Sequence, residues 1–411
     1  MSARFLQVGH SFSVPLRQVP FRRLWGARLT SFVGDRVVEV ALPFAALEVG
    51  HSARAVGFVL AATYAPNLLF ILAGGVWADR LPRVRVMVGA DVIRGAAQAT
   101  TAILLFSGAA RLWQLALLGA VYGLGTAFFA PASTAIVPET VTADALQDAN
   151  ALLNLTQSGV GIIGPALGGI LVAAAGPASA FALDATSFGI GTLLLLRMPV
   201  GARPAAEPEG FLTSVRRGWV EVRTRTWVAA AIGTFSVWNL AFASYFVLGP
   251  TVADRDLGGA GAWGAILACG SIGSIAGGLI SLRWRPERPL GAAFLLVGLC
   301  ALPLLGLAAP APTAIIAAAN LVAWAGLAIA NTLWYTTLHV HVPADSLARV
   351  SSYDWLGSLI FQPIGLAVAG PLAVAIGTGV TLSGAALAVL VTPLVFLVAF
   401  ADIRRLSAAT A

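Results

Sequence analysis

Runs of apolar residues, each long enough to cross a bilayer, follow one another along almost the whole chain, and they constrain its fold more than any other feature. A membrane-spanning helix needs roughly 20 predominantly apolar residues. The 411 residues are 58% hydrophobic and 10% charged, with a mean hydropathy of +0.86. Backbone polar groups in lipid must bond to one another, which favours helices. We therefore expect an all-α integral membrane protein.

The apolar runs form two sets, separated by one long polar stretch. The twelve expected spans are 24–48, 56–77, 86–107, 112–136, 151–174, 178–198, 227–250, 262–282, 290–308, 313–338, 353–376 and 380–401. The polar stretch 199–226 is expected to be a cytoplasmic linker between an N-terminal half, 24–198, and a C-terminal half, 227–401. Residues 1–23 and 402–411 are expected to be cytoplasmic tails.

Arginines are distributed unequally between the two sets of loops. If both termini lie on one side, only Arg54, Arg111 and Arg255 fall in loops on the other side. An excess of arginine in short loops marks the cytoplasmic side. Both termini are therefore expected in the cytoplasm. Because the arginines are spread over several loops, the net charge of +7 does not indicate a nucleic-acid partner.

The charged hairpin between the second and third spans, GGVWADRLPRVR over residues 74–85, carries the most specific motif. Five of its residues match the pattern Gly-x-Leu-Ala-Asp-Arg-x-Gly-Arg, namely Gly75, Ala78, Asp79, Arg80 and Arg83. Trp77 and Pro82 depart from the Leu and the Gly of that pattern. The hairpin closely resembles the loop between helices 2 and 3 of the major facilitator superfamily of secondary transporters. The resemblance extends over nearly the whole chain.

This resemblance implies twelve helices in two pseudo-symmetric halves and a conformational latch between the halves. Asp79 would end helix 2 against the N-terminal end of helix 11, where the helix dipole attracts a carboxylate. Arg83 could pair with Asp354, and Gly75 and Arg80 complete the latch motif. The alternative is a positively charged cytoplasmic loop with an incidental acid.

A weak internal repeat supports the two halves. Gly74-Gly75 before Arg80 resembles Gly277-Gly278 before Arg283. Parallel repeats of this kind are typical of the superfamily, whose substrates bind between the halves near the bilayer midplane.

The fifth span carries a small-residue motif that resembles the helix-5 signature of antiporters in the family. Its residues are Gly164, Pro165, Gly168 and Gly169. Small residues let helices approach closely, so we expect a pliable seam that faces the other half. Generic packing of small residues is the alternative. The stretch 120–135 lacks the arginine that many drug–proton antiporters carry in helix 4.

Charged residues inside spans are costly and are therefore functional hypotheses. A first group is expected to form intramembrane charge pairs: Arg28, Arg36, Asp91, Arg94 and Asp184. Their depths along the helices allow the pairs Arg36–Asp184 and Arg28–Asp91, which would be structural.

Asp35 and Glu39 are the candidates for proton coupling. They lie four residues apart and so share one helical face. Two acids beside one arginine leave a spare carboxylate, and burial favours the neutral, protonated form of a carboxyl. The alternative is an acid in a salt bridge or at the lip of a cavity. The sequence does not distinguish Asp35 from Glu39.

Aromatic and amide side chains on helices 5, 7 and 10 suit a large amphipathic organic ligand. The candidates for the substrate cavity are Asn154, Gln157, Trp238, Asn239, Phe242, Tyr245, Trp324 and Asn331. The alternative for each aromatic is a position in the core or against lipid.

The sequence favours no enzymatic chemistry. It has no phosphate-binding loop of the G-x-x-x-x-G-K-[ST] type and no catalytic constellation. His339 and His341 lack a third ligand, so no metal and no cofactor are expected. We expect a monomer.

Within the superfamily, the chain looks most similar to the branch of macrolide, tetracycline and siderophore exporters. The similar features are Gly34-Asp35, residues 130–132 and residues 184–188. They imply proton-coupled export of small amphipathic molecules across a bacterial inner membrane. An importer or an uncoupled facilitator would share the fold, and a membrane scaffold or sensor is a further alternative.

Overall fold

The computed structural model describes residues 14–199, 225–343, 350–351, 353–354 and 357–400, without the side chains of 72–73 and 75–80. Most of the predicted linker 199–226, residues 1–13 of the predicted N-terminal tail and the whole predicted C-terminal tail 402–411 lie outside these ranges. The side chains of Gly75, Asp79 and Arg80 also lie outside them.

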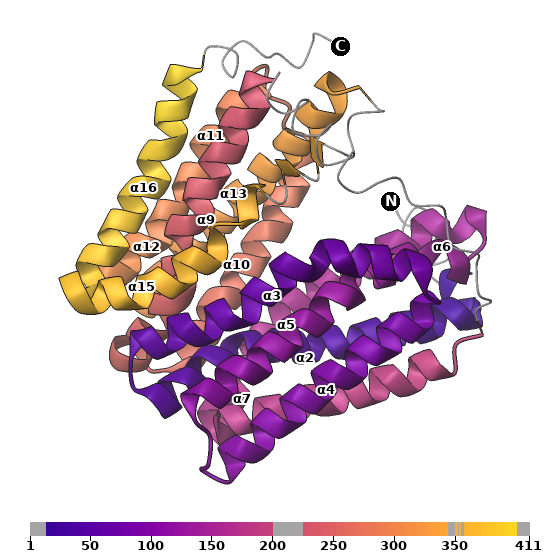
Figure 1. Cartoon of the computed structure of the whole chain (residues 1–411). Coiled ribbons are helices and arrows are strands. Elements are labelled where there is room, and N and C mark those ends of the chain that lie inside the picture. Colours follow the sequence, from indigo (N-terminus) through magenta and orange to yellow (C-terminus); the bar gives the residue numbers. More distant parts are fainter. Residues whose placement is uncertain (1–13, 200–224, 344–349, 352, 355–356, 401–411) are drawn as a thin grey trace, which may run out of the picture. The chain divides into compact units, whose positions relative to one another are not determined.

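The described residues are almost entirely helical, which confirms the prediction of an all-α chain (Figure 1). The first elements are α2 (Val19–Gly50), α3 (Ala53–Arg80), α4 (Arg83–Phe106), α5 (Leu112–Ala135), α6 (Val137–Thr140), η1 (Ala143–Ala145) and α7 (Leu146–Leu196). The later elements are α9 (Thr226–Val252), the π-helical turn η2 (Ala253–Leu257), α10 (Ala260–Ser281), α11 (Pro289–Val297), η3 (Gly298–Cys300), α12 (Ala301–Ala308), α13 (Thr313–His341), α15 (Gln362–Ile376) and α16 (Thr378–Ala399).

Within the described ranges, nine helical stretches are long and apolar enough to cross a membrane. The predicted spans 24–48 and 86–107 coincide with α2 and α4, which carry several charges and are not among the nine. The predicted spans 151–174 and 178–198 both fall within α7. The count of twelve spanning helices therefore stays a prediction.

A break at Gly176 divides α7 between its two predicted spans. Gly176 has φ 76° and ψ 167°, a conformation that L side chains rarely adopt and that glycine adopts readily. Pro177 follows and cannot donate a backbone hydrogen bond to the preceding turn. The chain can therefore reverse direction here without a long loop.

The span predicted at 353–376 is interrupted. A turn at 360–361 separates the helical residues 357–359 from α15, which begins at Gln362. Pro363 occupies the first turn of α15, where its missing N–H costs nothing. The apolar run of the predicted span continues through this break, so hydropathy does not reveal it.

The fold consists of two compact units, one of residues 1–45 with 62–207 and the other of 46–61 with 208–411. The segment 46–61 includes the first part of α3. Within the second unit, a Cβ atom on Gly57 would lie 2.5 Å from the carbonyl oxygen of Leu366. A Cβ atom on Gly370 would likewise clash with the carbonyl oxygen of Ala53. The first part of α3 and α15 therefore meet backbone to backbone.

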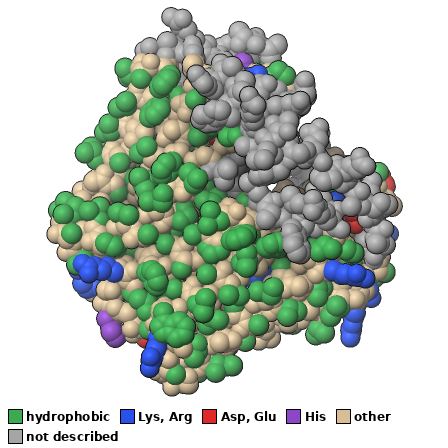
Figure 2. Space-filling model, in the orientation of Figure 1, with side chains coloured by type: hydrophobic (Ala, Val, Ile, Leu, Met, Phe, Trp, Pro, Cys, Tyr) green, Lys and Arg blue, Asp and Glu red, His purple; other side chains and the backbone are tan. Residues whose placement is uncertain are grey.

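Each unit has its own hydrophobic core. The core of the first unit includes Phe21, Leu24, Met87 and Phe129, and that of the second includes Trp227, Phe294, Trp334 and Leu338. Figure 2 shows hydrophobic side chains over most of the visible face, with charged ones at a few places. An apolar exterior is what a helical protein presents to lipid.

The internal repeat corresponds to equivalent helix contacts in the two units. A Cβ atom on Gly74 of α3 would clash with the carbonyl oxygen of Ala127 on α5. A Cβ atom on Gly277 of α10 would clash with that of Ala325 on α13. Glycine at both positions lets the paired helices pack against each other's backbone.

Gly277 and Gly278 form a matched pair for testing this contact. We expect Gly277→Ala to destabilise the folded protein by about 1–3 kcal/mol, the usual cost of overpacking. A Cβ atom on Gly278 meets nothing within 4 Å. Gly278→Ala should therefore leave stability unchanged or raise it by up to about 1 kcal/mol, because alanine favours the helix. Thermal unfolding in detergent measures both effects, and equal shifts for the two variants would contradict the contact.

Candidate functional site

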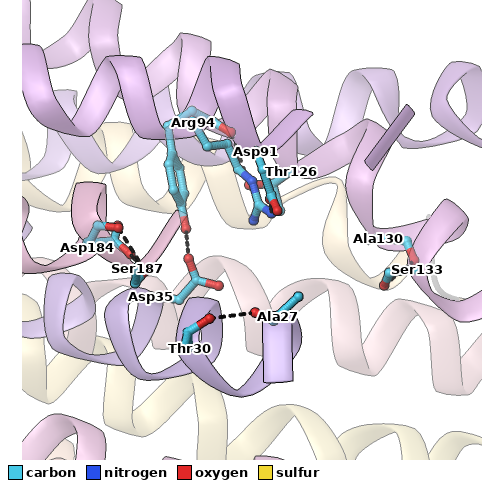
Figure 3. A network of polar contacts seen from close by, with 11 residues as sticks. Ala27, Thr30, Asp35, Asp91, Arg94, Thr126, Ala130, Ser133, Asp184 and Ser187 are labelled. Carbon is cyan, nitrogen blue, oxygen red and sulfur yellow. Dashed lines mark hydrogen bonds and ion pairs between the residues drawn. The ribbon is translucent and has the colours of Figure 1, made fainter. Parts of the chain in front are cut away.

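Four helices of the first unit bring polar side chains together in its interior (Figure 3). The cluster comprises Asp35 from α2, Asp91, Arg94 and Gln98 from α4, Tyr122 from α5, and Asp184 and Ser187 from α7. We call these seven residues the acidic cluster. It holds three carboxyl groups and one guanidinium group.

Arg94 is the cation of the acidic cluster and is fixed in place. Its side chain is 2% exposed and forms an ion pair with Asp91, one turn away on the same helix. Its guanidinium carbon lies 4.2 Å from the ring centroid of Phe129 and 4.4 Å from that of Phe188. Desolvating two charges is costly, and their mutual attraction together with the aromatic faces offsets that cost. The charge of Asp91 is thereby compensated.

Asp184 is fully buried and is held by neutral donors. Its Oδ2 accepts a hydrogen bond of 2.7 Å from Nε2 of Gln98, and its Oδ1 accepts one of 3.2 Å from Oγ of Ser187. Gly34 of α2 packs directly against it, since a Cβ atom there would clash with Oδ1 of Asp184. Among the described residues, no basic side chain forms an ion pair with Asp184.

Asp35 follows Gly34 and lies at the side of the acidic cluster formed by α2. Its Oδ1 accepts a hydrogen bond of 2.5 Å from the hydroxyl of Tyr122. The Tyr122 ring packs edge-on against Phe188, with centroids 6.2 Å apart. Asp35 is partly exposed, and none of the described residues forms an ion pair with it. Among the three acids, Asp35 therefore combines partial exposure with the absence of a direct ion pair in the described part of the chain.

Glu39 has a different environment from Asp35, although both lie on α2. Its Oε2 is 2.7 Å from Nη1 of Arg36, and the two side chains are 27% and 49% exposed. An exposed pair of this kind contributes little stability. The structure therefore separates the two acids that the sequence could not distinguish.

Both charge pairs considered from helix depth are wrong. Arg36 pairs with Glu39 rather than with Asp184, because Glu39 lies one turn away on the same face of α2. Asp91 pairs with Arg94 in the same way, rather than with Arg28. Arg28 instead stacks over the ring of Phe32, with its guanidinium carbon 5.3 Å from the centroid.

The small-residue motif of α7 contacts α2 of its own unit, and the expected seam facing the other half stays a prediction. A Cβ atom on Gly164 would clash with the side chain of Arg36, and one on Gly168 would lie 2.8 Å from the carbonyl oxygen of Val37. Pro165 and Gly169 are buried beside them. The motif thus fixes the distance between α7 and the stretch of α2 that carries Asp35.

The described part of the predicted latch contains Arg83 and Asp354, each with a partner in its own unit. Nη1 of Arg83 lies 2.6 Å from Oε1 of Glu139 and donates to the carbonyl oxygen of Ala135 at 2.7 Å. Oδ2 of Asp354 accepts a hydrogen bond of 2.9 Å from Nε1 of Trp334. A contact between Arg83 and Asp354 stays a prediction.

The second unit contains a cavity of about 250 Å³ between α9, α13 and the segment that precedes α15. It is lined by Phe235, Trp238, Asn239, Leu327, Asn331, Trp334, Tyr335, Asp354, Ser358 and Leu359. Three of the predicted cavity residues are among them, namely Trp238, Asn239 and Asn331. Asn154 and Gln157 lie in the other unit, exposed on α7.

Three other predicted cavity residues, Phe242, Tyr245 and Trp324, are not part of this lining, although Phe242 stacks on Trp238 with ring centroids 4.7 Å apart. The rings of Phe242 and Tyr245 are buried and stacked, with centroids 5.0 Å apart. The hydroxyl of Tyr245 donates to Oδ1 of Asn320 at 3.0 Å, and Nε1 of Trp324 donates to the same oxygen at 3.1 Å. These aromatics therefore stabilise the contact of α9 with α13, the alternative that the sequence left open.

Sequence reasoning missed the neutral members of the acidic cluster. Tyr122, Gln98 and Ser187 carry no charge and so gave no signal of cost within a span. One signal was present, because Gln98 lies four residues after Arg94 and so shares its helical face. Glu139, the partner of Arg83, was also missed.

Comparison with known proteins identifies the family of the chain and proteins of similar sequence. The sequence profile of the Major Facilitator Superfamily matches residues 24–365. The enterobactin exporter EntS of Shigella boydii serotype 18 is 26% identical over 386 residues, which cover 94% of this chain and 92% of that protein. The enterobactin exporter EntS of Escherichia coli O6:K15:H31 is similar to the same extent.

Solved structures with the same fold include two transporters of other kinds. A peptide transporter POT bound to sulfate has a TM-score of 0.77 at 13% identity, covering 94% of this chain and 95% of that one. The nucleoside transporter NupG has a TM-score of 0.75 at 14% identity, covering 93% of this chain and 100% of that one.

The two ion pairs provide a test of the buried charge. Asp91→Asn leaves Arg94 buried without its ion-pair partner, and breaking a buried pair costs about 3–5 kcal/mol. Glu39→Gln breaks an exposed pair, whose loss costs about 0–1 kcal/mol. We therefore expect a much lower thermal stability in detergent for Asp91→Asn only. Similar melting of the two variants would contradict the assignment of Arg94 as a buried, compensated cation.

Proposed function

The chain belongs to the Major Facilitator Superfamily of transporters, and we propose that it exports small amphipathic molecules in exchange for protons. The membrane would be a bacterial inner membrane, with both termini in the cytoplasm, as the distribution of arginines favours. The likeness to the enterobactin exporter EntS supports export and a siderophore-like or drug-like substrate. Alternating access of the two halves would carry the substrate across.

The observation that carries the proton-coupling proposal is the surplus of carboxyl groups in the acidic cluster. Arg94 compensates Asp91, while Asp35 and Asp184 have only neutral hydrogen-bond donors among the described residues. A carboxylate without a counter-ion is costly inside a membrane. Binding a proton removes that charge, so protonation is the direct way for the cluster to lower its free energy.

Asp35 is the acid that we assign to proton exchange. Asp184 is fully buried, hydrogen-bonded to Gln98 and Ser187, and has no exposed surface through which to exchange a proton with solvent. Asp35 is partly exposed, and among the described residues it accepts one side-chain hydrogen bond, from Tyr122. In the proposed cycle, Asp35 takes a proton when the cluster is open to the outside and releases it when open to the cytoplasm. Tyr122 stabilises the carboxylate after the proton has been released and before the next one is taken up.

Replacing Asp35 should separate proton coupling from substrate passage. We expect Asp35→Asn to raise the accumulation of exported compounds to the level of cells that lack the protein. Counterflow in proteoliposomes, an exchange that needs no proton gradient, should persist in this variant. Glu39→Gln serves as the matched control and should export normally, because Glu39 is already paired with Arg36. The measurement is accumulation of a panel of dyes and antibiotics, with and without a protonophore.

Other outcomes of this assay point to the alternatives. Export by Asp35→Asn at the normal level would place the coupling site elsewhere. Export that a protonophore leaves unchanged would indicate an uncoupled facilitator. Higher accumulation in cells that express the wild-type protein than in cells that lack it would indicate an importer. Absence of transport for every compound would favour a narrow native substrate, or a scaffold or sensor.

The loop after α3 supports a second element of the proposal, the latch that the motif Gly75, Asp79, Arg80 and Arg83 implies. Asp79 would stabilise one end state of the transport cycle through the dipole of the helix near Asp354. We expect Asp79→Asn to insert normally but to slow transport several-fold, because that end state loses its latch. Initial rates of efflux from preloaded cells measure the effect, normalised to the amount of protein in the membrane. Full activity would remove the latch from the account.

A further inference from the structure

The cavity of the second unit contains an acid, Asp354, that the proposed proton exchange does not use. We propose that this cavity binds an organic cation, with the carboxylate of Asp354 as its counter-charge and aromatic rings as its walls. The proposal rests on the proposed function only in identifying the bound cation as the exported molecule. Binding itself does not require a proton gradient.

Asp354 is poised to receive a positive charge. Its side chain is 5% exposed, and Oδ2 accepts one hydrogen bond, from the indole of Trp334. Trp334 is itself 2% exposed and is held edge-on by Trp227, with ring centroids 5.7 Å apart. None of the described basic side chains forms an ion pair with Asp354. A desolvated carboxylate without a cation gains most from a ligand that supplies one.

The walls of the cavity suit an alkylated ammonium group. Four of the lining residues are aromatic, namely Phe235, Trp238, Trp334 and Tyr335. The rings of Phe235 and Trp334 lie at an angle of 57° with centroids 6.3 Å apart, so two walls meet at a corner. Aromatic faces attract cations, and rings grouped around a pocket are the usual means of binding quaternary ammonium groups.

A polar group on α9 complements the acid. Nδ2 of Asn239 donates to the carbonyl oxygen of Phe235 at 2.9 Å, within the same helix. The amide oxygen of Asn239 is therefore the atom left to accept a hydrogen bond. The charged side chain among the residues given for this lining is the carboxylate of Asp354, and this charge together with the π faces favours a cation over an anion.

The volume limits what the cavity can hold. Pockets that enclose a drug-sized ligand have volumes of about 300–1,000 Å³. This cavity, at about 250 Å³, matches a single charged head group with a small apolar attachment. Benzyltrimethylammonium is a probe of that size, and neopentylbenzene is its uncharged isostere.

The test is binding of the two probes to the purified full-length protein in detergent, followed by tryptophan fluorescence. Trp238 and Trp334 line the cavity and report on occupancy. We expect the wild-type protein to bind benzyltrimethylammonium more tightly than neopentylbenzene. Asp354→Asn should weaken binding of the cation at least about tenfold, the scale expected for losing a desolvated charge partner. Binding of the neutral probe should change little.

Two control variants keep the result interpretable. Asp354→Glu retains the charge and should keep most of the affinity. Asp254→Asn removes an exposed acid of the same unit and should leave binding unchanged. Equal binding of the two probes by the wild-type protein, or binding of the cation by Asp354→Asn at wild-type strength, would overturn the proposal. So would an absence of cation binding in the wild-type protein.

The failure of this proposal and the failure of proton-driven export are distinguishable. Cation binding that depends on Asp354, together with no protonophore-sensitive export, would retain the site and reject the transport proposal. Protonophore-sensitive export without cation binding would retain the transport proposal and reject the cation site.

Discussion

The need to compensate charge inside a membrane governs the interior of the first unit. Lipid supplies no water to solvate a buried guanidinium group, so Arg94 depends on Asp91 and on the faces of Phe129 and Phe188. That arrangement uses the one cation of the acidic cluster. In the described part of the chain, the remaining acids, Asp35 and Asp184, have no direct ion pair, and the side chains that donate hydrogen bonds to them are neutral. In this account the chemistry of transport follows from that imbalance.

Glycine residues let the helices approach closely enough to bring the three carboxyl groups and the one guanidinium group of the acidic cluster together. Gly34 places α2 against Asp184, and a Cβ atom on Gly125 of α5 would lie 2.7 Å from the side chain of Arg94. Gly164 and Gly168 bring α7 against α2 beside Arg36 and Val37. With larger residues, the carboxyl groups would be separated and each could find its own solvent or partner. The spacing of small residues therefore positions the charges, although it contributes no chemistry of its own.

The sequence predicted the helical class and the positions of the apolar runs, because both follow from hydropathy and length. It also singled out Asp35 and Glu39 as candidates, since an acid within a span is conspicuous, but it did not choose between them. It did not predict which charges pair. Depth along a helix is set by residue count, but consecutive residues such as Asp35 and Arg36 point about 100° apart, and depth alone does not give that direction. For the same reason, the sequence did not show that the rings of Phe242 and Tyr245 stack on each other.

The most direct test of the central claim is whether Asp35 takes up a proton. Infrared difference spectra of the purified protein, recorded between alkaline and acidic buffer, report the carbonyl band of a protonated carboxyl group. The account predicts such a band in the wild-type protein and in Glu39→Gln, and its loss in Asp35→Asn. An unchanged band in Asp35→Asn would show that another acid binds the proton and would contradict the assignment.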